Sequence, residues 1–114
     1  MGDCLFCAIV DGKAKANIVY QDERVVAFKD IRPRAPVHFL IIPRKHLAGV
    51  LDIESEDSEL IGEVFQVAAR LAREHGVSES GFRVVVNSGP DAGQSVFHLH
   101  YHLIGGRQMS WPPG

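Results

Sequence analysis

Three histidines stand at alternate positions near the end of the chain, in the stretch VFHLHYHLIGG at residues 96–106. Because side chains of a β-strand point alternately to its two faces, His98, His100 and His102 would share one face. A helix would scatter the three rings around its circumference. The spacing therefore predicts a strand with an imidazole face, and imidazoles either bind a metal jointly or supply a neutral nucleophile near pH 7.

A loop of glycine and polar residues leads directly into this strand. The segment NSGPDAGQS, residues 87–95, can turn backbone N–H groups toward an anion, and Ser95 adds a hydroxyl. Most glycine loops are plain turns, but one that precedes a histidine strand favours a phosphate site beside an imidazole. A metal triad is the alternative, although no Asp or Glu follows Asp91. We expect a histidine nitrogen to attack phosphorus and form a covalent phosphoramidate that water later cleaves.

The elements that position these groups follow from the pattern of apolar residues. A short helix is expected at residues 4–10, and a long helix with one apolar stripe at residues 58–75. Ser55 is the expected N-cap of the long helix, and Gly76 fits the left-handed position after its end. Strands are expected at residues 18–22, 25–30, 38–43 and 82–88 and across the histidine run. This order predicts an α+β fold with a five-stranded antiparallel sheet, one long helix and a short N-terminal helix.

Length and composition narrow the class of protein. A chain of 114 residues with 46% hydrophobic content fits one domain, residues 1–114. A net charge of −2 provides no general attraction to nucleic acid or to an anionic membrane, so neither is expected as a partner. No segment approaches the roughly 20 apolar residues of a membrane span, and the start lacks signal-peptide features. We expect a cytoplasmic protein whose two cysteines are thiols or metal ligands.

The stretch GQSVFHLHYHLIGGRQMSWPPG closely resembles the signature of the histidine triad (HIT) nucleotide-binding hydrolases, in particular their Hint branch. The stretches FKDIRPRAPVHFLIIPRKH and VVVNSGPDAGQS resemble the segments that form the nucleotide pocket of that family. The resemblance implies a HIT-like fold that pairs into a homodimer. It also implies a purine nucleoside phosphoramidase that cleaves AMP or GMP derivatives at the α-phosphate through a nucleotidyl-histidine intermediate.

The resemblance also implies roles for single residues. His100 would be the nucleophile, His102 would bind the phosphate and Ser95 would contact the leaving group, with His98 completing the triad. Asp30 matches the carboxylate that accepts both ribose hydroxyls. Matching phosphate-side positions are Asn87, Gly93 and Gln94, and matching base-pocket positions are Leu5, Phe6, Ile9, Phe28 and Ile31. For Phe6, Phe28 and Ile31, ordinary core packing is an equal alternative.

The pair Cys4-x-x-Cys7 has three interpretations: a redox pair, half of a zinc site, or coincidence. The redox interpretation lacks its usual βαβ context. A zinc site needs two more ligands, for which His46 and His98 are the candidates. Many bacterial HIT proteins resemble this chain in having zinc tie the N-terminal segment to the sheet, so structural zinc is preferred over free thiols. No cofactor is expected for catalysis.

Several features keep two interpretations. His38 either supports the triad or faces solvent. Four basic residues either steer an anionic substrate or only make their loops soluble: Arg32, Arg34, Arg44 and Lys45. The tail at residues 107–114 resembles the Hint terminus, which implies a position near the active site and a subunit or substrate contact for Trp111. A dinucleoside polyphosphate hydrolase and a non-catalytic nucleotide-binding or scaffold protein are the alternative functions.

Overall fold

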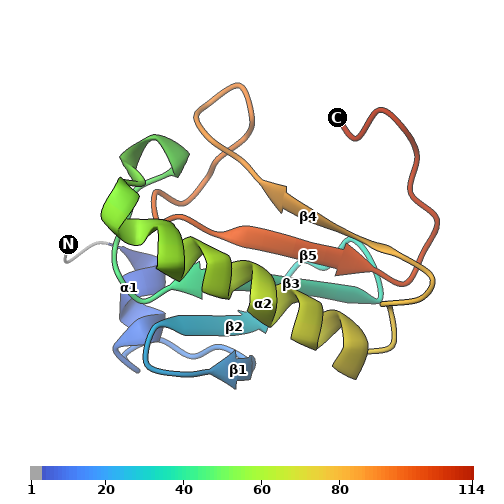
Figure 1. Cartoon of the computed structure of the whole chain (residues 1–114), viewed down its shortest axis with the longest axis horizontal. Coiled ribbons are helices and arrows are strands. Elements are labelled where there is room, and N and C mark those ends of the chain that lie inside the picture. The colour runs from blue at the N-terminus through green and yellow to red at the C-terminus, as the bar shows by residue number, and fades with distance from the viewer. Residues whose placement is uncertain (1–3) are drawn as a thin grey trace.

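The computed structural model describes residues 4–114 and contains a five-stranded antiparallel sheet with the strand order β1-β2-β3-β5-β4. Figure 1 shows α2 lying across the sheet and α1 close to β2 and β3. No helix within the described residues is long and apolar enough to span a membrane. The architecture confirms the α+β fold expected from the sequence. The elements are α1 (Leu5–Val10), β1 (Ile18–Gln21), β2 (Val25–Lys29), β3 (Val37–Pro43), η1 (Val50–Asp52), η2 (Ser55–Asp57), α2 (Ser58–Glu74), β4 (Phe82–Val86) and β5 (Tyr101–Gly105).

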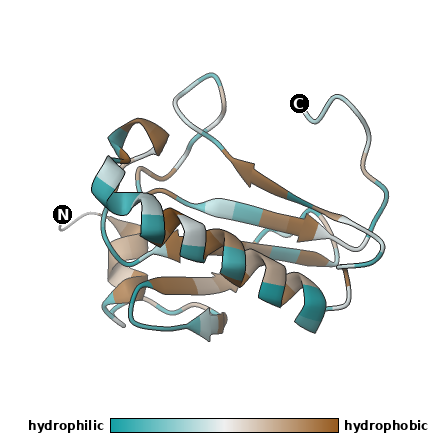
Figure 2. Ribbon diagram, viewed as in Figure 1, coloured by the Kyte–Doolittle hydropathy of each residue, from teal (hydrophilic) through white to brown (hydrophobic). Residues whose placement is uncertain are grey.

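The main core lies between α2 and one face of the sheet. Apolar residues recur three and four apart along α2, so that one stripe of the helix is buried while its outer side is hydrophilic (Figure 2). Val64 and Leu71 of this stripe are fully buried against Leu99 and Leu103. Burial of each such side chain stabilises the fold by about 1.5–3 kcal/mol. This packing holds β5 and the segment before it firmly against the helix.

A smaller apolar cluster lies on the opposite face, where α1 packs on β2 and β3. Its buried members are Phe6, Ile9, Val26, Phe28, Leu40 and Ile42. Because residues alternate along each strand, this face also receives the histidines, which cannot point into the core under α2. The sheet thus separates the main core under α2 from the face on which the histidine side chains lie.

The histidine run is only partly a strand, which corrects the sequence-based expectation. β5 begins at Tyr101, so His98 and His100 precede it. The reason is that the N–H of Leu99 donates to the carbonyl of Leu47, 2.6 Å away, rather than to a neighbouring strand. The side chains nevertheless alternate, with Leu99 and Leu103 in the main core and the histidines outside it.

The start of the long helix also differs from the expectation. Ser55 is not its N-cap, because a short 3₁₀ turn, η2, intervenes and Asp57 occupies the capping position. The Asp57 carboxylate accepts the N–H of Glu54 at 3.0 Å and the ammonium of Lys45 at 2.6 Å. The bond to Glu54 belongs to a capping box at the start of η2, and the Asp57 side chain makes no capping hydrogen bond to α2. The end is as expected, with Gly76 at a φ of 75°.

Candidate active site and metal centre

A pocket of about 450 Å³ opens on the histidine face, between α1, β2, β5 and the loop before β5. Its inner wall is built from Phe6, Ile9 and Phe28, which are also buried members of the smaller cluster, so core packing applies to Phe6 and Phe28 but not to the exposed Ile31. Leu5 and Ile31 form an exposed rim. The residues expected at the nucleotide site that line this pocket are Leu5, Phe6, Ile9, Phe28, Asp30, Ile31, Asn87, Gly93, Ser95, His100 and His102.

Gln94 is the expected phosphate-side residue that does not line the pocket. Its buried amide group donates to the carbonyls of Ala48 at 2.8 Å and Val96 at 3.2 Å, and its oxygen accepts the N–H of Gly89 at 2.9 Å. These bonds tie the loop to the segment after β3. The Gln94 side chain therefore positions Gly93 and Ser95, and its own hydrogen-bonding groups are already satisfied.

The backbone of His98 selects the tautomer of His100 that has its proton on Nδ1. The Nδ1 atom lies 2.8 Å from the carbonyl oxygen of His98, which can only accept a hydrogen bond. In the neutral ring the lone pair is therefore on Nε2, which makes no hydrogen bond within residues 4–114. The ring of Phe6 packs perpendicular to the imidazole at 5.2 Å between centroids, which fixes its orientation.

His102 receives the opposite tautomer from a chain of hydrogen bonds. The backbone N–H of Arg34 donates to Nδ1 of His38 at 3.0 Å, so the proton of His38 lies on Nε2. That nitrogen is 2.9 Å from Nδ1 of His102 and 3.3 Å from Oδ2 of Asp30. Nδ1 of His102 is therefore an acceptor, and its Nε2 carries the N–H. His38, left open by the sequence, is buried behind the triad.

The electrostatic environment keeps His102 uncharged. Burial, followed by the neighbouring His100 and His38, lowers the pKa of His102 to about 4. Burial likewise lowers the pKa of His38. Although Asp30, His38 and His102 have ligand atoms within 4.8 Å, the proton on Nε2 of His38 occupies the nitrogen that would bind a metal there. The site thus presents an N–H on Nε2 of His102 and, on His100, the Nε2 that carries the lone pair in the neutral tautomer.

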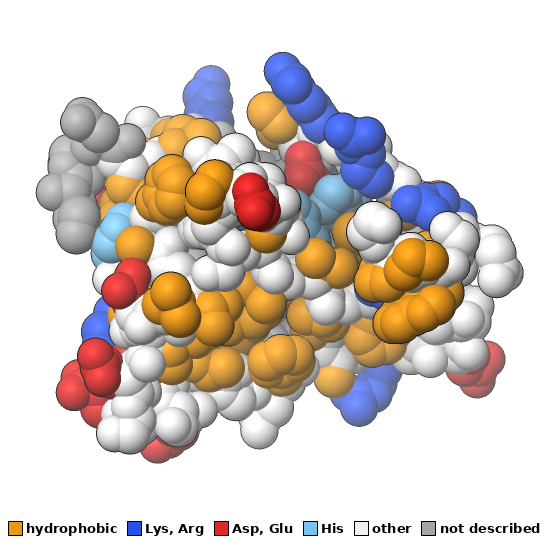
Figure 3. Space-filling model, turned by 90° about the horizontal axis from the view of Figure 1, so that it is seen from above, with side chains coloured by type: hydrophobic (Ala, Val, Ile, Leu, Met, Phe, Trp, Pro, Cys, Tyr) orange, Lys and Arg blue, Asp and Glu red, His pale blue; other side chains and the backbone are white. Residues whose placement is uncertain are grey.

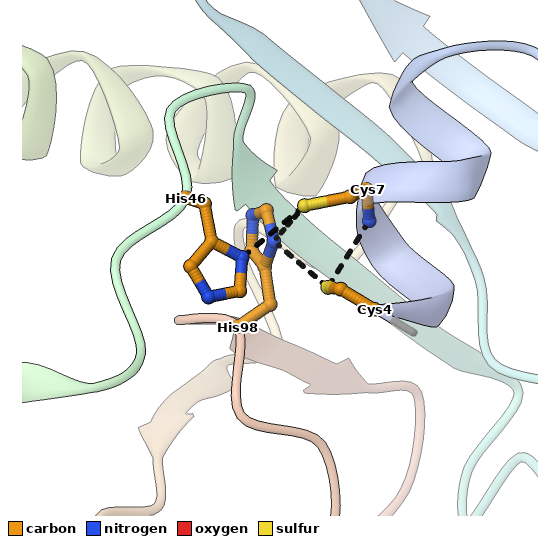
Figure 4. Close-up of side chains that lie close together, drawn as sticks. All are labelled: Cys4, Cys7, His46 and His98. Atoms are coloured by element: carbon orange, nitrogen blue, oxygen red, sulfur yellow. Dashed lines mark hydrogen bonds between the residues drawn. The ribbon is translucent and has the colours of Figure 1, made fainter. Parts of the chain in front are cut away.

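A second cluster of side chains joins α1 to the segment after β3 and to the segment before β5. Figure 4 shows Cys4 and Cys7 pointing toward the rings of His46 and His98, and the four ligand atoms all lie within 4.8 Å of one another. The Sγ atoms of Cys4 and Cys7 are each 3.5 Å from Nδ1 of His98, and Cys7 Sγ is 3.1 Å from Nδ1 of His46. Tetrahedral zinc with ordinary bond lengths separates sulfur and nitrogen ligands by about 3.5 Å.

The ring of His98 is set for metal binding through Nδ1. Its Nε2 donates to the carbonyl oxygen of Pro43 at 2.8 Å, which leaves the lone pair on Nδ1, facing both sulfurs. Burial lowers the pKa of His98, so the ring stays neutral. Desolvation and the neighbouring Cys4 raise the pKa of Cys7 to about 11, and a divalent cation would stabilise both thiolates. The residues fit a closed, structural Cys₂His₂ site.

The metal centre and the reaction pocket meet at His98. Both of its ring nitrogens are engaged, so its imidazole has no free nitrogen for a substrate. Its backbone carbonyl oxygen, however, accepts the hydrogen bond from Nδ1–H of His100. His98 therefore acts through the backbone, as a positioning residue between the two sites.

Comparisons with known proteins agree with this geometry. A family model described as the HIT domain matches residues 11–109. The crystal structure of a HIT family hydrolase from Legionella pneumophila Philadelphia 1 is 50% identical with a TM-score of 0.97, and the match covers 98% of this chain and 100% of that one. The 14 kDa zinc-binding protein of Brassica juncea is 45% identical over 98% of this chain and 100% of its own length. A zinc-bound histidine triad family protein from Mycobacterium smegmatis is 37% identical with a TM-score of 0.80, covering 96% and 79% of the two chains.

The chain belongs to the HIT domain family, and its fold is that of the HIT hydrolases. This confirms the family expected from the sequence signature. The match also fits a nucleotide as the ligand of the pocket on the histidine face.

Proposed function

We propose that this protein is a Hint-like hydrolase that cleaves purine nucleoside phosphoramidates at the α-phosphate through a covalent nucleotidyl-His100 intermediate. The observation that carries the proposal is the hydrogen bond from Nδ1 of His100 to the carbonyl of His98, because it makes Nε2 the lone-pair nitrogen of the neutral ring at a nucleotide-sized pocket. A neutral, oriented imidazole is the nucleophile that attack on phosphorus needs.

The pocket offers a place for each part of a nucleoside monophosphate. The apolar wall of Phe6, Ile9 and Phe28 suits a purine ring, and the carboxylate of Asp30 suits the ribose hydroxyls. The phosphate then lies near His100 and His102. There the Nε2–H of His102 donates to a non-bridging oxygen, where charge builds up in the transition state.

The reaction proceeds in two displacements at phosphorus. The lone pair on Nε2 of His100 forms the N–P bond while the P–N bond to the leaving amine breaks, and the amine takes one proton from solvent near the exposed Ser95. The carbonyl of His98 stabilises the positive charge that the ring then carries. Water attacks phosphorus next, the N–P electron pair returns to Nε2, and one proton goes to solvent. The products are the amine and the nucleoside monophosphate.

The test is to trap the intermediate. Purified protein is incubated with adenosine 5′-phosphoramidate, quenched in base, digested and examined by mass spectrometry for an added AMP on the peptide that contains His100. The variant His100→Ala should lose hydrolysis and the adduct while it still binds AMP. Turnover by His100→Ala close to that of the parent would refute the mechanism. Faster cleavage of dinucleoside polyphosphates than of phosphoramidates would instead assign the alternative hydrolase.

We also propose that zinc occupies the Cys4–Cys7–His46–His98 cluster as a structural ion that clamps α1 onto the sheet. The donor set and distances support this, as do a zinc-binding and a zinc-bound relative. The clamp matters for the pocket because α1 contributes Phe6 and Ile9 to its wall. Metal analysis of the purified protein should find about one zinc per chain.

The assembly is proposed on the resemblance together with two surface features. β4 is an edge strand of the sheet, and Phe65 on α2 is half exposed, so both suit pairing into a homodimer. We also propose that residues 1–114 form one domain whose tail, residues 107–114, lies near the active site, which the 2.7 Å hydrogen bond from Arg107 to the carbonyl of Arg34 supports. We propose a cytoplasmic location, where the thiols stay reduced. Light scattering in solution tests the dimer.

A further inference from the structure

Both cysteines of the chain lie in α1 or at its start, next to two residues of the reaction pocket. Cys4 is the N-cap of α1 and Cys7 lies within it, while Phe6 and Ile9 of the same helix line the pocket. The helix has six residues, which is too few for a stable helix in isolation. Its position therefore depends on what fastens it to the rest of the molecule.

Two attachments fasten α1. Its apolar side chains pack in the smaller cluster on β2 and β3, and its cysteines reach His46 and His98. The segments that carry these two histidines are joined to each other by the hydrogen bond from the N–H of Leu99 to the carbonyl of Leu47. The histidines thus stay side by side with or without a metal, and what a metal adds is the link from them to α1.

Phe6 carries the position of α1 into the reaction pocket. Its ring packs edge-on against the rings of His100, at 5.2 Å, and of His98, at 6.1 Å between centroids. It also belongs to the apolar wall to which we assign the base. Figure 3 shows histidine side chains in a hollow of the surface, where a ligand reaches them from solvent. A shift of α1 therefore changes both the fit of a nucleotide and the orientation of the nucleophile.

The two cysteines are placed for oxidation to a disulfide. Both are half-buried rather than enclosed, so a small oxidant reaches them. Their sulfurs lie within 4.8 Å of each other, and the N–H of Cys7 already donates to Sγ of Cys4 at 3.2 Å. The Cys-x-x-Cys spacing is that of dithiols that interconvert with disulfides. Sulfurs bound to zinc are thiolates, which is the form that peroxides oxidise.

We propose that Cys4 and Cys7 form a redox switch, in which hydrogen peroxide joins them in a disulfide, releases zinc and loosens α1 from the pocket. The inference rests on the proposed function and on the proposed zinc site, and it adds a regulation of that same pocket. The pair binds the metal when it is reduced and forms a disulfide when it is oxidised. The pocket is therefore complete only in the reduced, zinc-bound form.

The oxidation takes two steps. One thiolate attacks an oxygen of hydrogen peroxide, which gives a sulfenic acid and hydroxide, and the second thiolate then displaces hydroxide from that sulfur as the S–S bond forms. The two sulfurs together lose two electrons, and two protons from solvent convert both hydroxides to water. Only two neutral ligands, His46 and His98, remain for the zinc ion, which therefore leaves.

The first experiment exposes the zinc-loaded protein to hydrogen peroxide. A chromophoric chelator should detect the release of about one zinc per chain, and mass spectrometry should show the loss of the two thiol hydrogens. Calorimetry should show about 10-fold weaker binding of AMP, because Phe6 and Ile9 leave the pocket wall. Dithiothreitol with added zinc should restore AMP binding, which distinguishes the disulfide from oxidised methionine.

Two controls separate oxidation from the loss of metal. The variant Cys4→His/Cys7→His keeps four zinc ligands without a thiol, so peroxide should leave its zinc content and its AMP affinity unchanged. Chelation of zinc from the parent without peroxide should weaken AMP binding by the same factor as peroxide does. This second control tests the link between metal and pocket even if the variant takes up no zinc.

Zinc release together with weaker AMP binding supports the switch even if no phosphoramidate is hydrolysed, in which case the proposed function alone fails. Where hydrolysis is present, kcat/KM should fall at least as far as the AMP affinity. The proposal is overturned if peroxide leaves zinc bound, if zinc leaves while the AMP affinity stays constant, or if the parent protein takes up no zinc.

Discussion

Replacing His38 by phenylalanine removes the group that selects the tautomer of His102. His38 is buried, and a phenyl ring has nearly the volume of the imidazole, so the variant His38→Phe should keep the packing. It loses the 2.9 Å hydrogen bond from Nε2 of His38 to Nδ1 of His102, together with the acceptor of the Arg34 N–H and the contact with Asp30. Nδ1 of His102 is then a buried acceptor without its partner.

The expected effect on catalysis follows from the bond to His102. Leaving a buried acceptor unsatisfied costs about 1–3 kcal/mol, and the tautomer with the proton on Nε2 loses this preference over the alternative. If the Nε2–H of His102 stabilises charge in the transition state, a loss of about 1.4–2.7 kcal/mol corresponds to a 10- to 100-fold fall in kcat/KM. The position of the nucleophile, set by His98 and Phe6, is left unchanged.

The assay combines steady-state kinetics with NMR of the imidazole nitrogens. In the parent, the His102 signals should be those of a neutral ring protonated on Nε2, and in His38→Phe they should shift toward a mixture of tautomers. His75→Gln, which changes a histidine at the end of α2, is the control and should leave both readouts as in the parent. A folded His38→Phe protein with parental kcat/KM, or with the His102 tautomer unchanged, would refute the reasoning.

Three further predictions concern stability. Removing zinc by chelation, or removing one zinc ligand by Cys7→Ser, should release α1 and destabilise the fold by ~2 kcal/mol. Calorimetry with and without added zinc should then show a Tm that is lower by about 8 °C. An unchanged Tm would show that the metal site is not structural. Leu103→Ala opens a cavity in the fully buried main core and should cost about 2–5 kcal/mol in urea unfolding, whereas Leu51→Ala, at an exposed site, should cost far less. Because burial lowers the pKa of His102 from 6.5 to about 4, the unfolded chain binds a proton between these values that the folded chain does not. The free energy of unfolding should therefore fall by up to roughly 3 kcal/mol as pH drops from 6.5 to 4, and His102→Gln should flatten this slope.

Local patterns were enough to predict the elements of the fold and the residues that could react. The three-and-four spacing of apolar residues located α2, and alternation of polar and apolar residues indicated which side of the last strand carries the histidines. The cysteine pair indicated half of a metal site. These features depend on neighbours within a few positions, so the order of residues contains them directly.

Contacts between distant segments decided the rest. The sequence-based N-cap at Ser55 is wrong because the 3₁₀ turn η2 occupies Ser55–Asp57, where Asp57 pairs with Lys45, twelve residues earlier. The histidine run leaves the ladder before Tyr101 because Leu99 bonds to Leu47. The Gln94 side chain does not line the pocket because its amide group donates a hydrogen bond to the carbonyl of Ala48.

The clearest case is the chemistry of the triad itself. Three histidines at alternate positions determine a shared face, but not which nitrogen of each ring carries a proton. The register of β3 against β5 brings His38 to His102, and the carbonyl of His98 comes to Nδ1 of His100. An imidazole is a nucleophile or a donor according to the partner of its other nitrogen. The sequence by itself therefore determined which rings are present, and the tertiary structure decided what each ring can do.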